Sequence, residues 1–215
     1  MNELDPKAAR KEAVKDMKRE LIMDAAVKVI ERDGYGNVRL DDVAEEAGFS
    51  KAAIYNYFPD KEALFVHIVI RDQRAVYDRY VEIMSRNMPF LDTLRELAII
   101  SCAKFCKGGG ITSTPAMLSN FFVSMTKHED LFNASMLCMK EQFDLLLQFI
   151  AKAKSAGVLT IPVCDETVCN FIVSFFQTVT MQNMYAVRNG EIDQFDINSV
   201  IDDLFTFFSP WIRKM

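Results

Sequence analysis

The chain has 215 residues, of which half are hydrophobic and 26% are charged, and it contains only 8 glycines and 6 prolines. This composition excludes intrinsic disorder and collagen-like repeats, and it does not suit a fold of short strands punctuated by Gly and Pro. The formal net charge of -5, from 25 basic and 30 acidic residues, excludes a basic field over the whole molecule as the means of binding a partner.

The sequence shows no sign of export or of membrane insertion. Residues 1–20 alternate charges with alanines, and the longest apolar stretches fall far short of the ~18 residues that a spanning helix needs. Five cysteines, an odd number, indicate free thiols in a reducing compartment. We therefore expect a cytoplasmic protein with no membrane partner.

A basic segment precedes the first predicted helix. Between Lys7 and Arg19, six basic residues oppose two acidic ones. A charge run of this kind is either a solvated extension or an arm that lies in the minor groove of DNA, and the sequence leaves both interpretations open. We treat residues 1–18 as a basic N-terminal extension.

Helical periodicity then begins. Apolar residues from Leu21 to Ile30 follow one helical face, which ends before the glycine-containing turn at 33–36. A second, very short helix begins at Leu40 and ends at Gly48. These breaks predict two helices separated by a tight turn.

Two more helices follow in the first third of the chain. Ser50 is placed to cap a third helix, which Pro59 ends, and Asp60 is placed to cap a longer fourth helix to about Met84. Beyond Pro89 the pattern stays helical, and no alternation with period two competes with it. We expect an all-α fold. Its further helices are predicted near 90–107, 115–126, 131–156, 165–189 and 197–214.

The last two predicted helices carry a large apolar surface. Apolar side chains recur at steps of three and four along 197–214, and they spread around most of the helix at 165–189. Such helices either pass through the centre of a domain or are covered by a partner subunit, and we favour a homodimer. The predicted dimer interface consists of Ile172, Phe175, Phe176, Val179, Ile201, Leu204, Phe205 and Phe208.

Three residues in the second and third helices have the spacing of a helix-turn-helix. Ala44 supplies the small side chain where two crossing helices meet, and Gly48 suits a turn that needs positive φ. Ile54 then fills the wedge between the helices. The flanking residues extend this pattern with LIMDAA at 21–26, DGY at 33–35, LDDVAEEAGFSK at 40–51 and IYNYFPDKEALF at 54–65.

With these motifs, residues 19–65 closely resemble the DNA-binding domain of TetR-family transcriptional regulators. Past Phe65 the resemblance is architectural only, in helix count, length and the apolar C-terminal pair. It implies a three-helix DNA-binding domain at 19–65, followed by a larger effector-binding and dimerisation domain at 66–215.

The resemblance also implies how DNA is bound. In such proteins the third helix, here Lys51 to Phe58, lies in the major groove, and the two copies of a dimer read half-sites about 34–36 Å or a multiple apart. Lys51 is then placed for a phosphate or a guanine edge, and Ala53 for a thymine methyl. Tyr55 and Lys61 match phosphate-binding positions of the family. The predicted DNA-binding residues are Arg39, Ser50, Lys51, Ala52, Ala53, Tyr55, Asn56 and Lys61.

The start of the second helix departs from the family pattern. Arg39 stands where the family often has a Ser or Thr cap, and Asp41 stands where an arginine is often found. Arg39 is therefore either a phosphate or minor-groove contact, or a solvated charge paired with Asp41 or Asp42. Acidic residues here, Glu45 and Glu46 included, weaken non-specific DNA binding wherever they face phosphate.

Polar residues that interrupt the later apolar helices predict a small-molecule site, since such sites are apolar cavities with a few polar groups. Core packing or dimer contact is the alternative role of each of these side chains. We expect an apolar or aromatic effector. The candidate ligand-binding residues are Phe105, Asn120, Phe121, Met125, Met139, Gln142, Phe143, Gln177, Met181 and Tyr185.

The sequence thus predicts a ligand-responsive regulator, most simply a repressor that a small effector releases from a palindromic double-stranded DNA operator. The alternative is a helix-turn-helix-shaped module that binds a protein or a ligand but no DNA. No nucleophile elbow, phosphate loop or paired metal-ligand motif appears, so we expect no enzyme activity, cofactor or metal.

Overall fold

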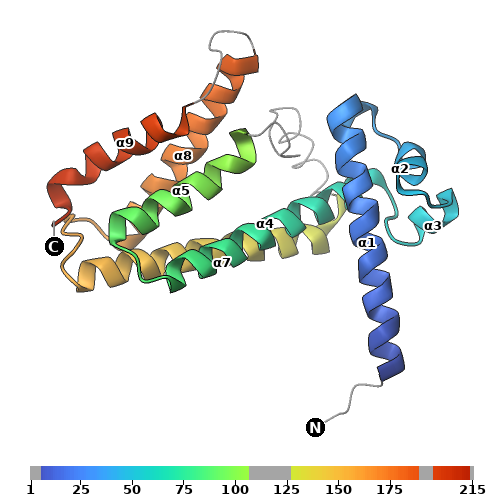
Figure 1. Ribbon diagram of the computed structural model, residues 1–215, viewed down its shortest axis with the longest axis horizontal. Helices are drawn as coiled ribbons and strands as arrows, with labels where there is room; N and C mark the ends of the chain where they lie inside the picture. The colour runs from blue at the N-terminus through green and yellow to red at the C-terminus, as the bar shows by residue number, and fades with distance from the viewer. Residues whose placement is uncertain (1–5, 107–126, 189–195, 214–215) are drawn as a thin grey trace. The chain divides into compact units, whose positions relative to one another are not determined.

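The chain folds as a set of α-helices in the computed structural model (Figure 1). The structure describes residues 6–106, 127–188 and 196–213. Within these ranges no strand forms beyond one isolated bridge between Leu159 and Ile212, and no helix is both long and apolar enough to cross a membrane. The predicted all-α fold is confirmed. The elements are α1 (Pro6–Asp33), η1 (Tyr35–Asn37), α2 (Leu40–Ala47), α3 (Lys51–Tyr55), α4 (Lys61–Ser85), α5 (Phe90–Cys106), α7 (Glu129–Ser155), α8 (Asp165–Arg188), α9 (Ile197–Phe208) and η2 (Ser209–Trp211).

Two compact units make up the chain. Among the described residues, the first unit contains 6–69 and 127–132, and the second contains the rest. The segment 19–65, to which the sequence assigned the helix-turn-helix, lies entirely in the first unit. The beginning of α4 and the first residues of α7 complete that unit. The helix predicted near 115–126 lies outside the described residues.

The first helix, α1, begins well before its apolar periodicity does. It is helical from Pro6, although residues 6–17 are all exposed and bury no apolar face. Ala, Lys, Arg and Glu are strong helix formers, and proline is tolerated at the first helical position. The Lys15 ammonium nitrogen lies 3.3 Å from the Oε1 atom of Glu12 one turn away, and this ion pair stabilises the helix locally. The basic segment is therefore a helical continuation of α1.

The first unit has a small core to which α1, η1, α2, α3 and α4 contribute. Gly48 ends α2 in the left-handed conformation, with φ 70° and ψ 27°, as its place in the predicted turn requires. Tyr35 packs against Phe65 with ring centroids 4.6 Å apart, so that η1 rests on α4. The core side chains include Ile22, Ala26, Val29, Val43, Ala44, Ile54, Phe58, Leu64, Phe65 and Ile68.

The prediction that the third helix reaches Phe58 was wrong by three residues. α3 ends at Tyr55, and the amides of Tyr57 and Phe58 both donate to the carbonyl of Ile54 at 2.9 Å. This closes a turn, and Pro59 has no N–H with which to extend a helix. The turn leads directly into α4, whose cap is the predicted Asp60.

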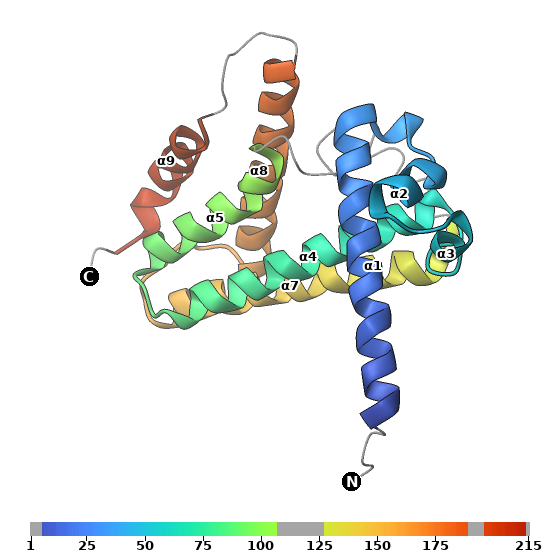
Figure 2. The same ribbon diagram turned by 45° about the vertical axis from the view of Figure 1, so that its right-hand side comes forward.

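The second unit is a helical bundle in which α5 packs against both α8 and α9 (Figure 2). The later part of α4 runs beside α7, where Gln73 accepts a hydrogen bond from Ser135 at 3.1 Å. α9 ends at Phe208, short of the predicted 214, because Pro210 directs the chain into η2. The core includes Ile83, Leu94, Leu97, Leu146, Ile150, Val168, Ile172, Phe176, Ile201, Leu204 and Phe208.

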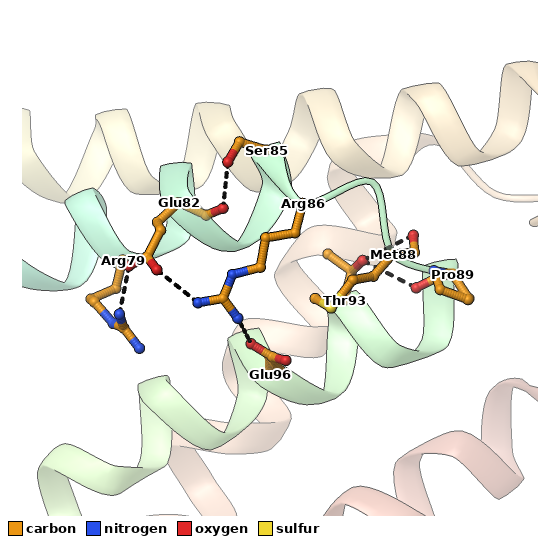
Figure 3. A network of polar contacts seen from close by, with 8 residues as sticks. All are labelled: Arg79, Glu82, Ser85, Arg86, Met88, Pro89, Thr93 and Glu96. Carbon is orange, nitrogen blue, oxygen red and sulfur yellow. Dashed lines mark hydrogen bonds and ion pairs between the residues drawn. The ribbon is translucent and has the colours of Figure 1, made fainter.

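A polar network holds the corner between α4 and α5 (Figure 3). Arg86 donates to Glu82 at 2.7 Å and to Glu96 at 2.8 Å, so it joins the two helices. The buried hydroxyl of Thr93 donates to the carbonyl of Pro89 at 3.1 Å. The corner is thus fixed by side chains from both helices.

Candidate nucleic-acid interface

The short helix α3 is anchored from one side and from one end. Ile54 is completely buried, and the adjoining Ala44 of α2 is 2% exposed. The hydroxyl of Ser50 accepts the amide hydrogen of Ala53 at 3.2 Å, which caps the helix. A five-residue helix is too short to be stable alone, so the cap and the buried isoleucine hold it in place.

The other side of α3 is exposed. Lys51, Ala52 and Asn56 are exposed and Ala53 is partly buried, while Tyr55 is 54% exposed although it is a large aromatic residue. Since Ile54 lies between them and points inward, these side chains share the outer surface of one short helix. The structure thus brings together five of the predicted DNA-binding residues.

Arg39, the predicted DNA-binding residue before α2, takes part in the start of that helix through its backbone. The backbone amide of Arg39 donates to the carboxylate of Asp42 at 3.2 Å, which is the reciprocal bond of a capping box. Asp41 pairs with Lys51, and Asp42 accepts the backbone amide of Arg39, so neither of these contacts uses the Arg39 side chain. Arg39 itself is exposed at the entrance to α2.

Lys61 lies against the first unit rather than extending from it. Its ammonium nitrogen is 5.1 Å from the centroid of the Tyr35 ring and 3.4 Å from the carbonyl oxygen of Gly36. A cation over an aromatic face is stabilised by the ring quadrupole. The predicted phosphate lysine therefore also ties the start of α4 to η1.

An ion-pair cluster at the start of α4 was missed by the sequence analysis. Asp60 accepts the Ala63 amide at 2.7 Å, the His128 ring nitrogen at 2.9 Å and the Lys127 ammonium at 2.8 Å. Partial burial opposes ionisation, but hydrogen bonds from Lys127, Ala63 and His128 outweigh it and lower the pKa of Asp60 to about 2. The sequence carries no signal for this cluster, because His128 and Asp60 are separated by 68 residues.

The second histidine, His67, belongs to the core of the same unit. Its ring packs edge-on against Phe58 with centroids 5.4 Å apart. Burial lowers the pKa of His67, and Coulombic repulsion from Arg19 and His128 lowers it further. The lowered pKa favours the neutral ring in this packing position.

The structure describes the side chains of four of the ten candidate ligand-binding residues. Met139 and Gln177 are exposed, and Phe143 packs against the core of the second unit. Gln142 donates to the carbonyl of Gln73 at 2.6 Å, which is a contact between α7 and α4. Six of the candidates lie outside the described residues or have side chains that are not described, namely Phe105, Asn120, Phe121, Met125, Met181 and Tyr185.

Most residues that we predicted to form a dimer interface lie instead in the core of the chain's own second unit. Ile172, Phe176, Ile201, Leu204 and Phe208 are buried inside the chain's own second core, Phe175 and Phe205 are partly buried against it, and the side chain of Val179 is not described. The apolar stripe of α9 faces α5, because that helix supplies the apolar cover that we assigned to a partner. The two helices expose a different pair, Phe171 and Phe207, whose rings stack with centroids 4.8 Å apart.

Two short helices joined by a left-handed glycine, with the second helix anchored inside and exposed outside, define a helix-turn-helix protein. Residues 22–68 match the family described as bacterial regulatory proteins, tetR family. This N-terminal segment of the chain thus matches the family that its sequence resemblance indicated.

Sequence relatives match over part of the chain. The uncharacterized HTH-type transcriptional regulator YuxN of Bacillus subtilis is 32% identical over 69 residues, which are 32% of this chain and 24% of that protein. The HTH-type transcriptional regulator RutR of Escherichia coli is 38% identical over 52 residues, 24% of each chain. The match thus spans about a quarter of the length of these relatives.

Solved structures share the fold over nearly the whole chain. The fatty acid degradation regulator FadR from Bacillus halodurans has a TM-score of 0.65 at 17% identity, with 96% of both chains covered. The reduced form of NemR from E. coli has a TM-score of 0.63 at 17% identity, with 88% of this chain and 96% of that chain covered. Identities this low establish the common fold and nothing about ligands.

Proposed function

We propose that the chain is a DNA-binding transcriptional regulator whose α3 enters the major groove of a duplex operator. The observation that carries this proposal is the exposed face of α3, where Lys51, Tyr55 and Asn56 stand on a helix that Ile54 anchors. Tyr55 on this face presents a phenolic hydroxyl, a group that can bond a phosphate oxygen. The match of residues 22–68 to the tetR family model supports the same role for this segment.

The residues of this face suit the contacts that a groove-bound helix makes. The small side chains of Ala52 and Ala53 allow the helix backbone to approach the base edges, and a methyl group can pack on a thymine methyl. The Tyr55 hydroxyl and the Asn56 amide are neutral groups of the kind that bind phosphate oxygens. Because basic residues are few here, the lysines of the helical extension of α1 supply further phosphate contacts.

We propose further that the protein acts as a homodimer on a palindromic operator. The stacked and exposed rings of Phe171 and Phe207 support a partner surface on α8 and α9, since exposed aromatic side chains are typical of subunit interfaces. A two-fold dimer places two copies of α3 on two symmetry-related half-sites.

The regulation that we propose is release of a repressor by a small apolar or aromatic effector bound in the second unit. Structural neighbours support a small-molecule site there: FadR from Bacillus subtilis was solved in complex with stearoyl-CoA, and a protein from Saccharomonospora viridis in complex with choline. An effector that lowers operator affinity 100-fold needs to favour the released conformer by only about 2.7 kcal/mol. Titration of the DNA complex with long-chain acyl-CoA and with choline tests both ligand types.

The test of the DNA-binding role begins with selection of a duplex from a random pool by the wild-type protein. Two variants with substitutions in α3 are then compared with wild type on the selected duplex. Lys51→Ala and Tyr55→Phe are each expected to weaken binding to the selected site without lowering the unfolding temperature. Lys28→Ala is the matched control, because the side chains of Lys28 and Lys51 are both 68% exposed in the first unit. A wild-type chain that selects no duplex at low ionic strength, or an affinity that neither α3 variant changes, contradicts the proposal.

A further inference from the structure

An ion pair joins the two helices of the helix-turn-helix at the surface that we propose faces DNA. The ammonium nitrogen of Lys51, the first residue of α3, lies 2.5 Å from the Oδ2 atom of Asp41 in the first turn of α2. The Lys51 side chain is 68% exposed and the Asp41 side chain 31% exposed, so the pair is open to an approaching partner. Together the two groups carry no net charge.

The surroundings of this pair are acidic. It lies in an open hollow of about 570 Å³ whose charged lining consists of Arg39 and Lys51 against Asp41, Asp42 and Glu45. Asp42 is held by its hydrogen bond to the amide of Arg39. The hollow therefore has an excess of negative charge, and a DNA phosphate that approaches Lys51 also approaches carboxylates.

Phosphates and base edges differ in what they offer such a pair. A phosphate presents only acceptors and a negative charge, so Asp41 opposes its contact with Lys51. In the major groove a guanine presents the O6 and N7 acceptors, and its cytosine partner presents an amino donor. An ammonium and a carboxylate side by side are complementary to that base pair.

We propose that Asp41 is a specificity-determining residue, which holds Lys51 as an ion pair so that it reads a G·C base pair instead of binding phosphate. This inference rests on the DNA-binding function proposed above and assigns a role to a residue outside the predicted contact set. Its consequence is weak binding to unrelated duplexes, which favours the operator in competition with the rest of the genome.

The experiment compares Asp41→Asn with Glu31→Gln in the full-length chain. Glu31 is an exposed residue of α1 in the same unit, so both variants lose one negative charge from the surface. Affinity is measured across a salt series for two duplexes, one of random sequence and one selected by the wild-type protein.

Asp41→Asn is expected to free Lys51 for a phosphate. The plot of log K against log salt for the random duplex then steepens by about 0.9, and binding at low salt tightens by about an order of magnitude. Preference for the selected site over the random duplex falls by about 5- to 100-fold, which is the discrimination of one good base contact. Glu31→Gln is expected to change neither the slope nor the preference.

A double variant identifies the group responsible. In Asp41→Asn with Lys51→Met, the salt slope on random DNA is expected to return to the wild-type value, because the freed ammonium is gone. If Asp41→Asn proves unstable in thermal unfolding, Asp41→Ser replaces it with another short polar side chain in the first turn.

Two failures are distinguishable. If the wild-type chain selects a site but Asp41→Asn behaves as Glu31→Gln does, the role of Asp41 is overturned and the proposed function stands. A slope that stays steep in the double variant also overturns it. If the wild-type chain binds no duplex, the proposed function fails and this inference fails with it.

Discussion

Removal of the charge of Asp60 is the most direct test of the cluster at the start of α4. Asp60→Asn keeps a side chain that can accept the Ala63 amide, because asparagine is as good an N-cap as aspartate. It removes the charge that faces the Lys127 ammonium at 2.8 Å and the His128 ring at 2.9 Å. The substitution therefore isolates the electrostatic contribution from the cap.

The magnitude follows from the pKa of Asp60, which the cluster lowers from the ordinary 3.8 to about 2. A depressed carboxylate pKa stabilises the folded state above the unfolded pKa, and this stability is lost as the pH falls through the folded pKa. The shift corresponds to about 2 kcal/mol at neutral pH, and about half of that remains near pH 3. The Asp60 side chain is 24% exposed but its partner Lys127 is 55% exposed, so solvent screening reduces this energy and about 2 kcal/mol is an upper value.

The assay is urea unfolding of wild-type protein, Asp60→Asn and the exposed control Glu31→Gln at pH 7 and at stepwise lower pH. Asp60→Asn is expected to be less stable than wild type at pH 7 by up to about 2 kcal/mol, with a difference that shrinks as the pH falls below 4. Glu31→Gln is expected to stay close to wild type throughout. A pH-independent difference refutes the electrostatic reasoning and leaves only a packing effect.

Three further predictions concern the first unit. Ile54→Ala is expected to lower the free energy of unfolding by about 2–5 kcal/mol, measured with urea, because its side chain is completely buried; a change below about 1 kcal/mol contradicts its role as the anchor of α3. Gly48→Ala is expected to cost about 1 kcal/mol, since an added Cβ meets no atom within 4 Å and only the positive φ of 70° is unfavourable; a stabilised variant would argue against this conformation. Replacement of Lys7, Lys11 and Lys15 by glutamine is expected to flatten the salt dependence of DNA binding by about two units or more, because each phosphate neutralised contributes about 0.9. An unchanged slope means that the extension of α1 makes no contact with DNA.

Local signals in the sequence predicted the helix-turn-helix well. Gly48, the Ser50 cap and the Asp60 cap act on backbone groups within a few residues, so their effect is readable from neighbouring letters. The buried residues Ala44 and Ile54 were predicted for the same reason, because two short helices joined by a tight turn have one way to meet. The exposure of Tyr55 then follows from helical periodicity.

Other features were decided by tertiary structure, because they join groups that are distant in sequence or choose between equivalent faces. The packing of α5 determined which side of α8 and α9 faces inward. Side chains that we had assigned to a dimer interface are therefore part of the core. The pairing of Lys51 with Asp41 required the crossing of α2 and α3. The cluster around Asp60 required Lys127 and His128, just before α7, to lie beside the start of α4. Periodicity determines that a helix has an apolar face and where it ends, whereas only the packed chain determines what that face meets and which charges are brought within reach of one another.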